Sequence, residues 1–227
     1  MMFPKARKGV SKIFVAEIMT LIAALIAGVI SAIITAAGGI DNLNLTGEMT
    51  SSGTTIVVCT IVVGVLLLLA GLMKIIGYFQ AAGDEEYFTR AIIFAIIGVV
   101  LYVIVGFLQH KDGVVMEWIY TGVLAIAELM QLLVMTSTIN GLAELSYRCR
   151  RDALVSRGNT ILKIIGTIFS LNICLIILNR VFRLFLREDI VSTIAIIVTI
   201  VIILLTIIAY FLYLGYLGKV SRMLKES

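Results

Sequence analysis

Charged side chains are scarce in this sequence. Of its 227 residues, 14% are Asp, Glu, Lys or Arg and 61% are hydrophobic, whereas about a quarter of the residues in a soluble domain are charged. Water could not solvate such a surface, so the composition excludes an ordinary soluble protein and predicts a chain solvated by lipid. Because little sequence lies outside the apolar runs, we expect one membrane domain over residues 1–227.

Histidine and cysteine are also rare, which removes most site chemistry. The one histidine, His110, lies in a short loop, and the three cysteines do not pair at ligand spacing. We therefore expect neither a disulfide nor a metal site. No HExxH, GxSxG or phosphate-binding glycine loop occurs, and no pair of aspartates lies within the apolar runs. The sequence therefore predicts that the protein is not an enzyme and needs no metal and no cofactor.

Proline is nearly absent, since the only one is Pro4. Discontinuous transporter helices are often broken by Pro or Gly near the bilayer midplane, and here neither a proline nor a glycine pair interrupts an apolar run. A span needs about 20 apolar residues, and six such runs occur, at residues 13–37, 54–79, 91–109, 114–142, 160–182 and 190–214. The first is about twice as long as a signal-peptide core, so we interpret it as an uncleaved span. The predicted fold is an all-α bundle of six regular transmembrane helices.

Basic residues divide unequally between the two sides of these spans. With the N-terminus inside, 14 of the 18 Lys and Arg residues fall on the inner side, and only Lys111, Arg180, Arg183 and Arg187 fall outside. Since cytoplasmic loops are rich in Lys and Arg, this predicts an N-in/C-in topology. The three outer arginines follow helical spacing, which indicates a short amphipathic surface helix or a miscounted span. The net charge of +4 needs no nucleic-acid partner, because topology and anionic lipid account for it.

A glycine lies near the inner end of each even-numbered span, at Gly77, Gly141 and Gly215. A polar segment follows each of them. The pattern predicts one out-and-back helical hairpin used three times in tandem, all in one orientation, unlike the inverted repeats of many secondary transporters. The alternative is accidental similarity between apolar sequences.

The most informative charge is Glu128, near the centre of the fourth run. A carboxylate at mid-bilayer costs roughly 2.5–3.5 kcal/mol on an insertion scale, so such acids usually face a partner or a water-filled cavity. Gln131 lies on the same helical face, and Ser170 and Asn172 lie on the next span. We expect these four residues to form a polar pocket between the fourth and fifth spans that binds a proton, a cation or an amine-bearing solute. The alternative is that Glu128 is a protonated, hydrogen-bonded link between helices.

Polar residues at helical spacing also mark other spans. They include Glu17 in the first run, Lys74 and Tyr78 in the second, and Tyr210 in the sixth. We interpret these stripes mainly as packing faces, because small and polar residues let membrane helices approach and hydrogen-bond. Glu17 lies within about a turn of a predicted membrane surface, and Lys74 is one of the basic residues counted on the inner side.

An acidic segment interrupts the basic inner side, at Asp84, Glu85 and Glu86. One interpretation is a solvated turn that caps the third span, whose positive dipole end it would face. The other is a docking surface for a basic partner, such as the inner loop. That loop carries three arginines, Arg148, Arg150 and Arg151, which could also contact lipid head groups.

Two functions fit these features. The first is a transport-type component: a small-solute-binding membrane subunit, or a small channel or carrier, with its pocket around Glu128. In size, span count and orientation the chain resembles the substrate-binding membrane subunits of vitamin-uptake transporters, a likeness of architecture alone. The second is a non-catalytic scaffold or accessory subunit that assembles through small-residue helix faces. The partners we expect are the lipid bilayer of a bacterial plasma membrane, and a second copy or a membrane or ATPase subunit.

Overall fold

The computed structural model describes residues 3–36, 51–109, 113–185 and 188–226. These ranges contain six α-helices and no strand. In chain order the helices are α1 (Pro4–Ala36), α2 (Ser51–Ala81), α3 (Tyr87–Leu108), α4 (Val114–Arg148), α5 (Asp152–Phe185) and α6 (Glu188–Glu226). All six are long enough and apolar enough to cross a membrane. The predicted all-helical, multi-pass membrane protein is therefore confirmed.

Several helices extend past the apolar runs that predicted them. α1 begins at Pro4 instead of residue 13, and α6 continues to Glu226 instead of residue 214. Lys, Arg, Leu and Met are good helix formers, so the basic flanks of a span end its apolar run without ending the helix. Pro4 occupies the first helical position, where its missing N–H would have no intrahelical partner anyway.

The basic segment at the end of α5 is not a separate surface helix. Residues 180–185 continue α5 to its end at Phe185, so that alternative is wrong for this part of the segment, and Arg187 lies outside the described residues. Arg180 forms an ion pair with Glu117 of α4, and its guanidinium lies 5.6 Å from the centre of the Trp118 ring. These contacts, rather than a separate surface helix, account for Arg180.

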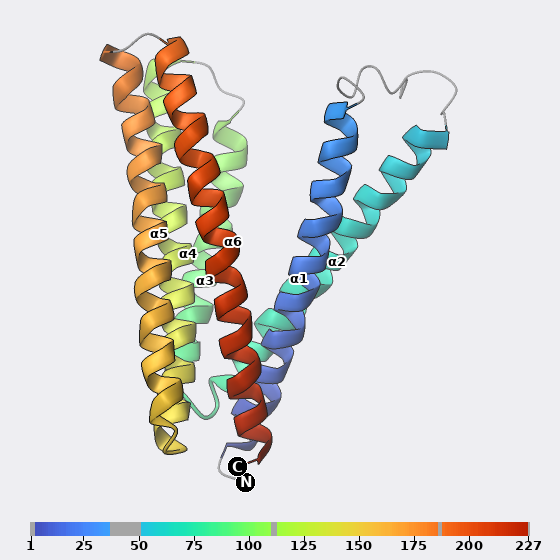
Figure 1. The fold of residues 1–227 in the computed structure, drawn as a ribbon, viewed down its shortest axis with the longest axis vertical. Coiled ribbons are helices and arrows are strands. Elements are labelled where there is room, and N and C mark those ends of the chain that lie inside the picture. The colour runs from blue at the N-terminus through green and yellow to red at the C-terminus, as the bar shows by residue number, and fades with distance from the viewer. Residues whose placement is uncertain (1–2, 37–50, 110–112, 186–187, 227) are drawn as a thin grey trace.

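The six helices form two parts that meet at one end (Figure 1). α3, α4, α5 and α6 pack in chain order, while α1 and α2 pair and lean away from them. The two parts touch where α1 meets α6 and α2 meets α3. The described chain also begins and ends here, so we call this end the termini end (Figure 1).

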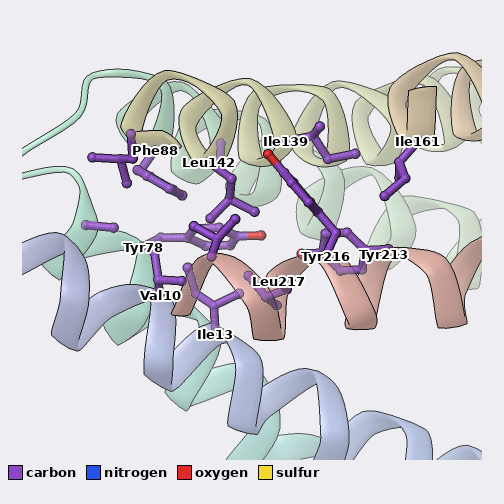
Figure 2. Close-up of a cluster of buried hydrophobic side chains, with 14 of the residues drawn as sticks. Val10, Ile13, Tyr78, Phe88, Ile139, Leu142, Ile161, Tyr213, Tyr216 and Leu217 are labelled. Atoms are coloured by element: carbon purple, nitrogen blue, oxygen red, sulfur yellow. The ribbon is translucent and has the colours of Figure 1, made fainter. Parts of the chain in front are cut away.

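The main hydrophobic core lies where the two parts join, toward the termini end. Figure 2 shows side chains from all six helices in this cluster: Val10, Ile13, Tyr78, Phe88, Ile139, Leu142, Ile161, Tyr213, Tyr216 and Leu217. Each of these is buried. Tyr78 projects from α2 into the space between α1, α4 and α6. This core holds the pair α1–α2 against the other four helices.

Glycine permits the close crossing of α1 and α2. A Cβ atom on Gly9 would overlap the backbone of Gly77, and one on Gly77 would lie 2.7 Å from the Ile13 side chain. Gly141 likewise faces Phe88 of α3, with 3.0 Å from the position of an added Cβ to the ring, whereas Gly215 has no neighbour within 4 Å. Of the three glycines that suggested a repeat, two therefore lie against the preceding helix and the third does not.

Candidate binding cavity and its buried polar clusters

An ion pair joins α1 to α2 inside the molecule. Lys74 Nζ lies 2.6 Å from Glu17 Oε1, and the Glu17 side chain is only 4% exposed. The Tyr210 hydroxyl of α6 lies 2.9 Å from both Glu17 Oε2 and the Glu17 carbonyl oxygen, to which it can donate. Glu17 is therefore buried and links three helices, α1, α2 and α6.

A second contact continues this cluster to α4. One turn after Lys74, the Tyr78 hydroxyl lies 3.0 Å from Thr138 Oγ1. Thr138 donates its own proton to the Val134 carbonyl oxygen at 2.7 Å, so Tyr78 is the donor of the bond between them. Both side chains are buried. Together the two contacts connect α1, α2, α4 and α6.

The sequence held a signal for this cluster. Glu17 is the only charged residue in the first predicted run, and Lys74 is the only one in the second. Opposite charges on consecutive spans are natural partners, because intramembrane charges pair with one another.

Glu128 of α4 lies in a separate cluster. The Tyr102 hydroxyl of α3 donates to Glu128 Oε1 at 2.9 Å, and Asn172 Nδ2 of α5 donates to Glu128 Oε2 at 3.3 Å. Within the described ranges no cation lies within ion-pair distance of this carboxylate. Two neutral donors therefore hold it between three helices. Tyr102 belongs to a stripe of small and polar residues at helical spacing in the third run, a pattern that by itself indicates only helix packing.

The other two residues of the expected pocket lie apart from this carboxylate. Gln131 and Ser170 are exposed, and neither forms a hydrogen bond to Glu128 within the described part of the chain. Gln131 instead lines a cavity whose wall consists of residues from α2, α3 and α4. Of the four expected residues, the structure thus brings together Glu128 and Asn172.

That cavity has a volume of about 410 Å³ and lies between α2, α3 and α4. Its wall includes Lys74 and Tyr78 from the first cluster, Tyr102 from the second, and Gln131. The remaining wall is apolar or glycine, and its rim is open, since Phe79 is 61% exposed. Ligand pockets commonly have this size and this composition, a mainly apolar wall with a few polar groups. We call it the α2–α4 cavity.

The acidic segment at the termini end is occupied by internal contacts. Asp84 Oδ2 accepts hydrogen bonds from the backbone N–H groups of Lys5, at 2.9 Å, and Ala6, at 2.7 Å. It therefore caps the first turn of α1, while Glu85 accepts hydrogen bonds from the backbone N–H groups of Glu86 and Tyr87 at the start of α3. Glu86 occupies the N-cap position of α3 but makes no side-chain cap bond. Its carboxylate pairs with exposed Arg90, one turn along.

Glu85 is the buried member of the acidic segment. Its side chain is 4% exposed, and Arg148 lies 2.9 Å from its Oε2. Arg148 also contacts Glu144 at 3.0 Å. Burial raises the pKa of Glu85 above its ordinary value, although the Arg148 guanidinium opposes this increase. The expected contact between the acidic segment and the arginine loop thus exists within the chain, through Arg148.

Arg150 and Arg151 differ from Arg148. They form the turn between α4 and α5, and neither forms an ion pair with another described residue.

The described residues also hold no group of three or more His, Cys, Asp or Glu side chains placed to bind a metal ion. Comparisons with protein-family models, curated proteins and solved structures gave no match to this chain. The polar clusters and the cavity are therefore the features from which a function can be inferred.

Proposed function

We propose that this chain is a transport-type membrane protein that binds a small amphiphilic solute in the α2–α4 cavity. The observation that carries the proposal is the wall of that cavity. Polar groups from two separate buried clusters, Lys74 and Tyr78 in one and Tyr102 in the other, reach the same largely apolar space. Helices that only pack against one another have no need of such a space.

The wall favours a particular kind of polar head. The Lys74 ammonium carries three protons and has Glu17 as its ion-pair partner, so protons remain for a ligand. The Gln131 amide can donate as well as accept. The two tyrosines donate their own protons elsewhere and offer only oxygen lone pairs. Carbonyl, hydroxyl or ether oxygens on a head group would accept from Lys74 and Gln131, and a hydroxyl could also donate to a tyrosine oxygen. The rest of the solute would be apolar, like the rest of the wall.

The carboxylate of Glu128 has an indirect role in this proposal. It accepts the proton of Tyr102 and so fixes the direction of that hydroxyl at the cavity wall. Asn172 holds the second carboxylate oxygen. Glu128 is thus a positioning residue, and an amine-bearing solute or a proton would reach it only if Tyr102 moved away.

The proposal includes the orientation of the chain in the membrane. The chain is one non-catalytic membrane domain with both termini in the cytoplasm, built from three tandem hairpins in a bacterial plasma membrane. The basic residues favour this orientation. Glu17 and Lys74 then lie in the inner half of the membrane, and a solute would enter sideways from the lipid past the open rim. Energy for uptake would come from a partner subunit.

Filling the cavity tests the proposal. Gly71 lines the cavity, and an added Cβ would meet nothing within 4 Å, so Gly71→Leu places a side chain in the space without a backbone clash. Gly64, two turns earlier on α2, is equally open but lies outside the cavity wall, so Gly64→Leu is the matched control. The assay is native mass spectrometry of protein extracted gently from its own membrane. We expect a small-molecule adduct on the wild type and on Gly64→Leu, but not on Gly71→Leu. An adduct that survives Gly71→Leu, or no adduct on the wild type, would contradict the proposal.

One observation favours the scaffold function as a second candidate. Gly28 of α1, Gly64 of α2 and Gly122 of α4 face open space within the described structure. Small residues on exposed faces let a helix from another chain approach closely. If the protein assembles with itself through these faces, Gly122→Leu should reduce the mass of the detergent-solubilised particle. A wild-type particle that contains one chain would remove self-assembly.

A further inference from the structure

A basic pocket lies at the termini end, away from the α2–α4 cavity. It has a volume of about 450 Å³ and lies between the α4–α5 turn and the last turns of α6. Four cations line it, two from the turn and two from α6: Arg150, Arg151, Lys219 and Arg222. Two carboxylates, Asp152 and Glu226, also line it, which leaves a formal excess of two positive charges (4 − 2).

The four cations are available to a ligand. None of them forms an ion pair with a carboxylate among the described residues. The contrast with Arg148 is clear, because Glu85 and Glu144 hold that guanidinium just before the turn. Within the described residues the four cations thus have no ion-pair partner, although Asp152 and Glu226 share the pocket wall.

The backbone at the turn adds a second observation. Arg150 has φ of 56°, in the left-handed region that glycine adopts much more readily than a residue with a long side chain. Glycine or asparagine would satisfy the backbone at this position. An arginine there places a guanidinium at the pocket, where it can bind a phosphate through two parallel hydrogen bonds.

We propose that this pocket binds a phosphate-bearing anion, supplied either by the head group of an anionic phospholipid or by free phosphate. Basic pockets at the ends of transmembrane helices suit such head groups, since each nearby Lys or Arg contributes to the attraction. The pocket also has an apolar part, from Leu154 and the buried Met223, which a glycerol backbone or the start of an acyl chain could contact. The site is independent of the proposed solute function.

The test compares two double variants that remove the same charge. Arg150→Gln with Arg222→Gln takes two cations from the pocket. The control, Lys8→Gln with Lys12→Gln, also removes two cations. They belong to the part of α1 at the termini end and do not line the pocket. Binding of phosphatidylglycerol and of phosphatidylcholine to each purified protein is titrated by native mass spectrometry. Arg150 and Arg222 are exposed, so the folded helical content should remain, which circular dichroism checks.

We expect the wild type to prefer phosphatidylglycerol, the pocket variant to bind it about 30-fold more weakly, and the control to stay close to the wild type. If both variants lose the same affinity for phosphatidylglycerol, the lipid responds only to diffuse surface charge, and the proposal is overturned. Equal affinity of the wild type for the two lipids, measured before any phosphate is added, would also overturn it. In a further arm, millimolar inorganic phosphate is added. Retention of the lipid supports a head-group site, and displacement from the wild type but not from the pocket variant supports a free-phosphate site.

Discussion

The ion pair between Glu17 and Lys74 gives the strongest prediction for stability. The perturbation is Lys74→Met, which keeps the length of the apolar stem and removes the ammonium. Glu17 would then keep only its bonds from Tyr210, in a site where its side chain is 4% exposed. Because the Glu17 carboxylate cannot reach water, it must either stay charged without a cation or take up a proton.

The size of the effect follows from two different energies. Removing one partner of a buried ion pair costs about 3–5 kcal/mol, whereas a hydrogen bond between membrane helices averages about 0.6 kcal/mol. Protonation of Glu17 relieves part of the cost, so we expect Lys74→Met to lower the free energy of unfolding by about 3 kcal/mol. Tyr210→Phe, which removes only a hydrogen bond, should cost well under about 2 kcal/mol.

The two partners should also respond unequally. Glu17→Gln leaves Lys74, whose side chain is 30% exposed and lines the α2–α4 cavity, so its ammonium can move out of the buried site along its flexible stem. This variant should therefore lose less stability than Lys74→Met. The double variant should lose about as much as Glu17→Gln alone, because no unpaired charge remains in it.

The assay is reversible unfolding in mixed micelles as the fraction of dodecyl sulfate increases. A double-mutant cycle over the four proteins gives the coupling energy, which should equal the cost of Lys74→Met, about 3 kcal/mol. Coupling below about 0.5 kcal/mol would refute the reasoning. So would a Lys74→Met protein that is no less stable than Tyr210→Phe.

Three further predictions concern the other polar contacts. Glu128→Leu should destabilise the protein more than Glu128→Gln in the same unfolding assay, because it leaves both the Tyr102 hydroxyl and an amide without an acceptor. Asp84→Ala should cost about 1 kcal/mol through the loss of the α1 cap, whereas Glu86→Ala, which removes an exposed pair, should stay within about 0.5 kcal/mol. Burial raises the pKa of Glu85 above 4.5, so the folded chain holds the proton of this carboxyl more tightly than the unfolded chain. The contribution of Glu85 to the free energy of unfolding therefore falls as pH increases through the raised pKa. Glu85→Gln should remove this component from a pH series.

The membrane-spanning helices could be predicted because their cause is local. Scarce charge and runs of about 20 apolar residues define spans whatever their neighbours are. Helix ends were less predictable, as the extension of α1 back to Pro4 shows. An apolar run ends where the chain leaves the lipid and its side chains are solvated by water. A helix ends only where its backbone hydrogen bonds or its residue propensities require it.

The polar clusters depend on which helix faces meet, and that is not a local property. Helical spacing placed Gln131 beside Glu128 along α4, but the chain folds so that α3 and α5 supply the partners of this carboxylate. Tyr102 is one residue in a stripe that packing alone could explain. The cap from Asp84 to α1 joins residues 78 positions apart, and nothing in the acidic segment itself shows which helix it serves.

The most direct test of the central claim is photo-crosslinking from inside the α2–α4 cavity. Met135 lines the cavity, and a diazirine analogue of methionine at this position alone would capture whatever lies there in the native membrane. The same analogue at Leu67, which is 46% exposed on α2 and outside the cavity wall, reports on bulk lipid. The account predicts a discrete small-molecule adduct at position 135 that is absent at position 67. The same series of phospholipid adducts at both positions, or no adduct at position 135, would contradict it.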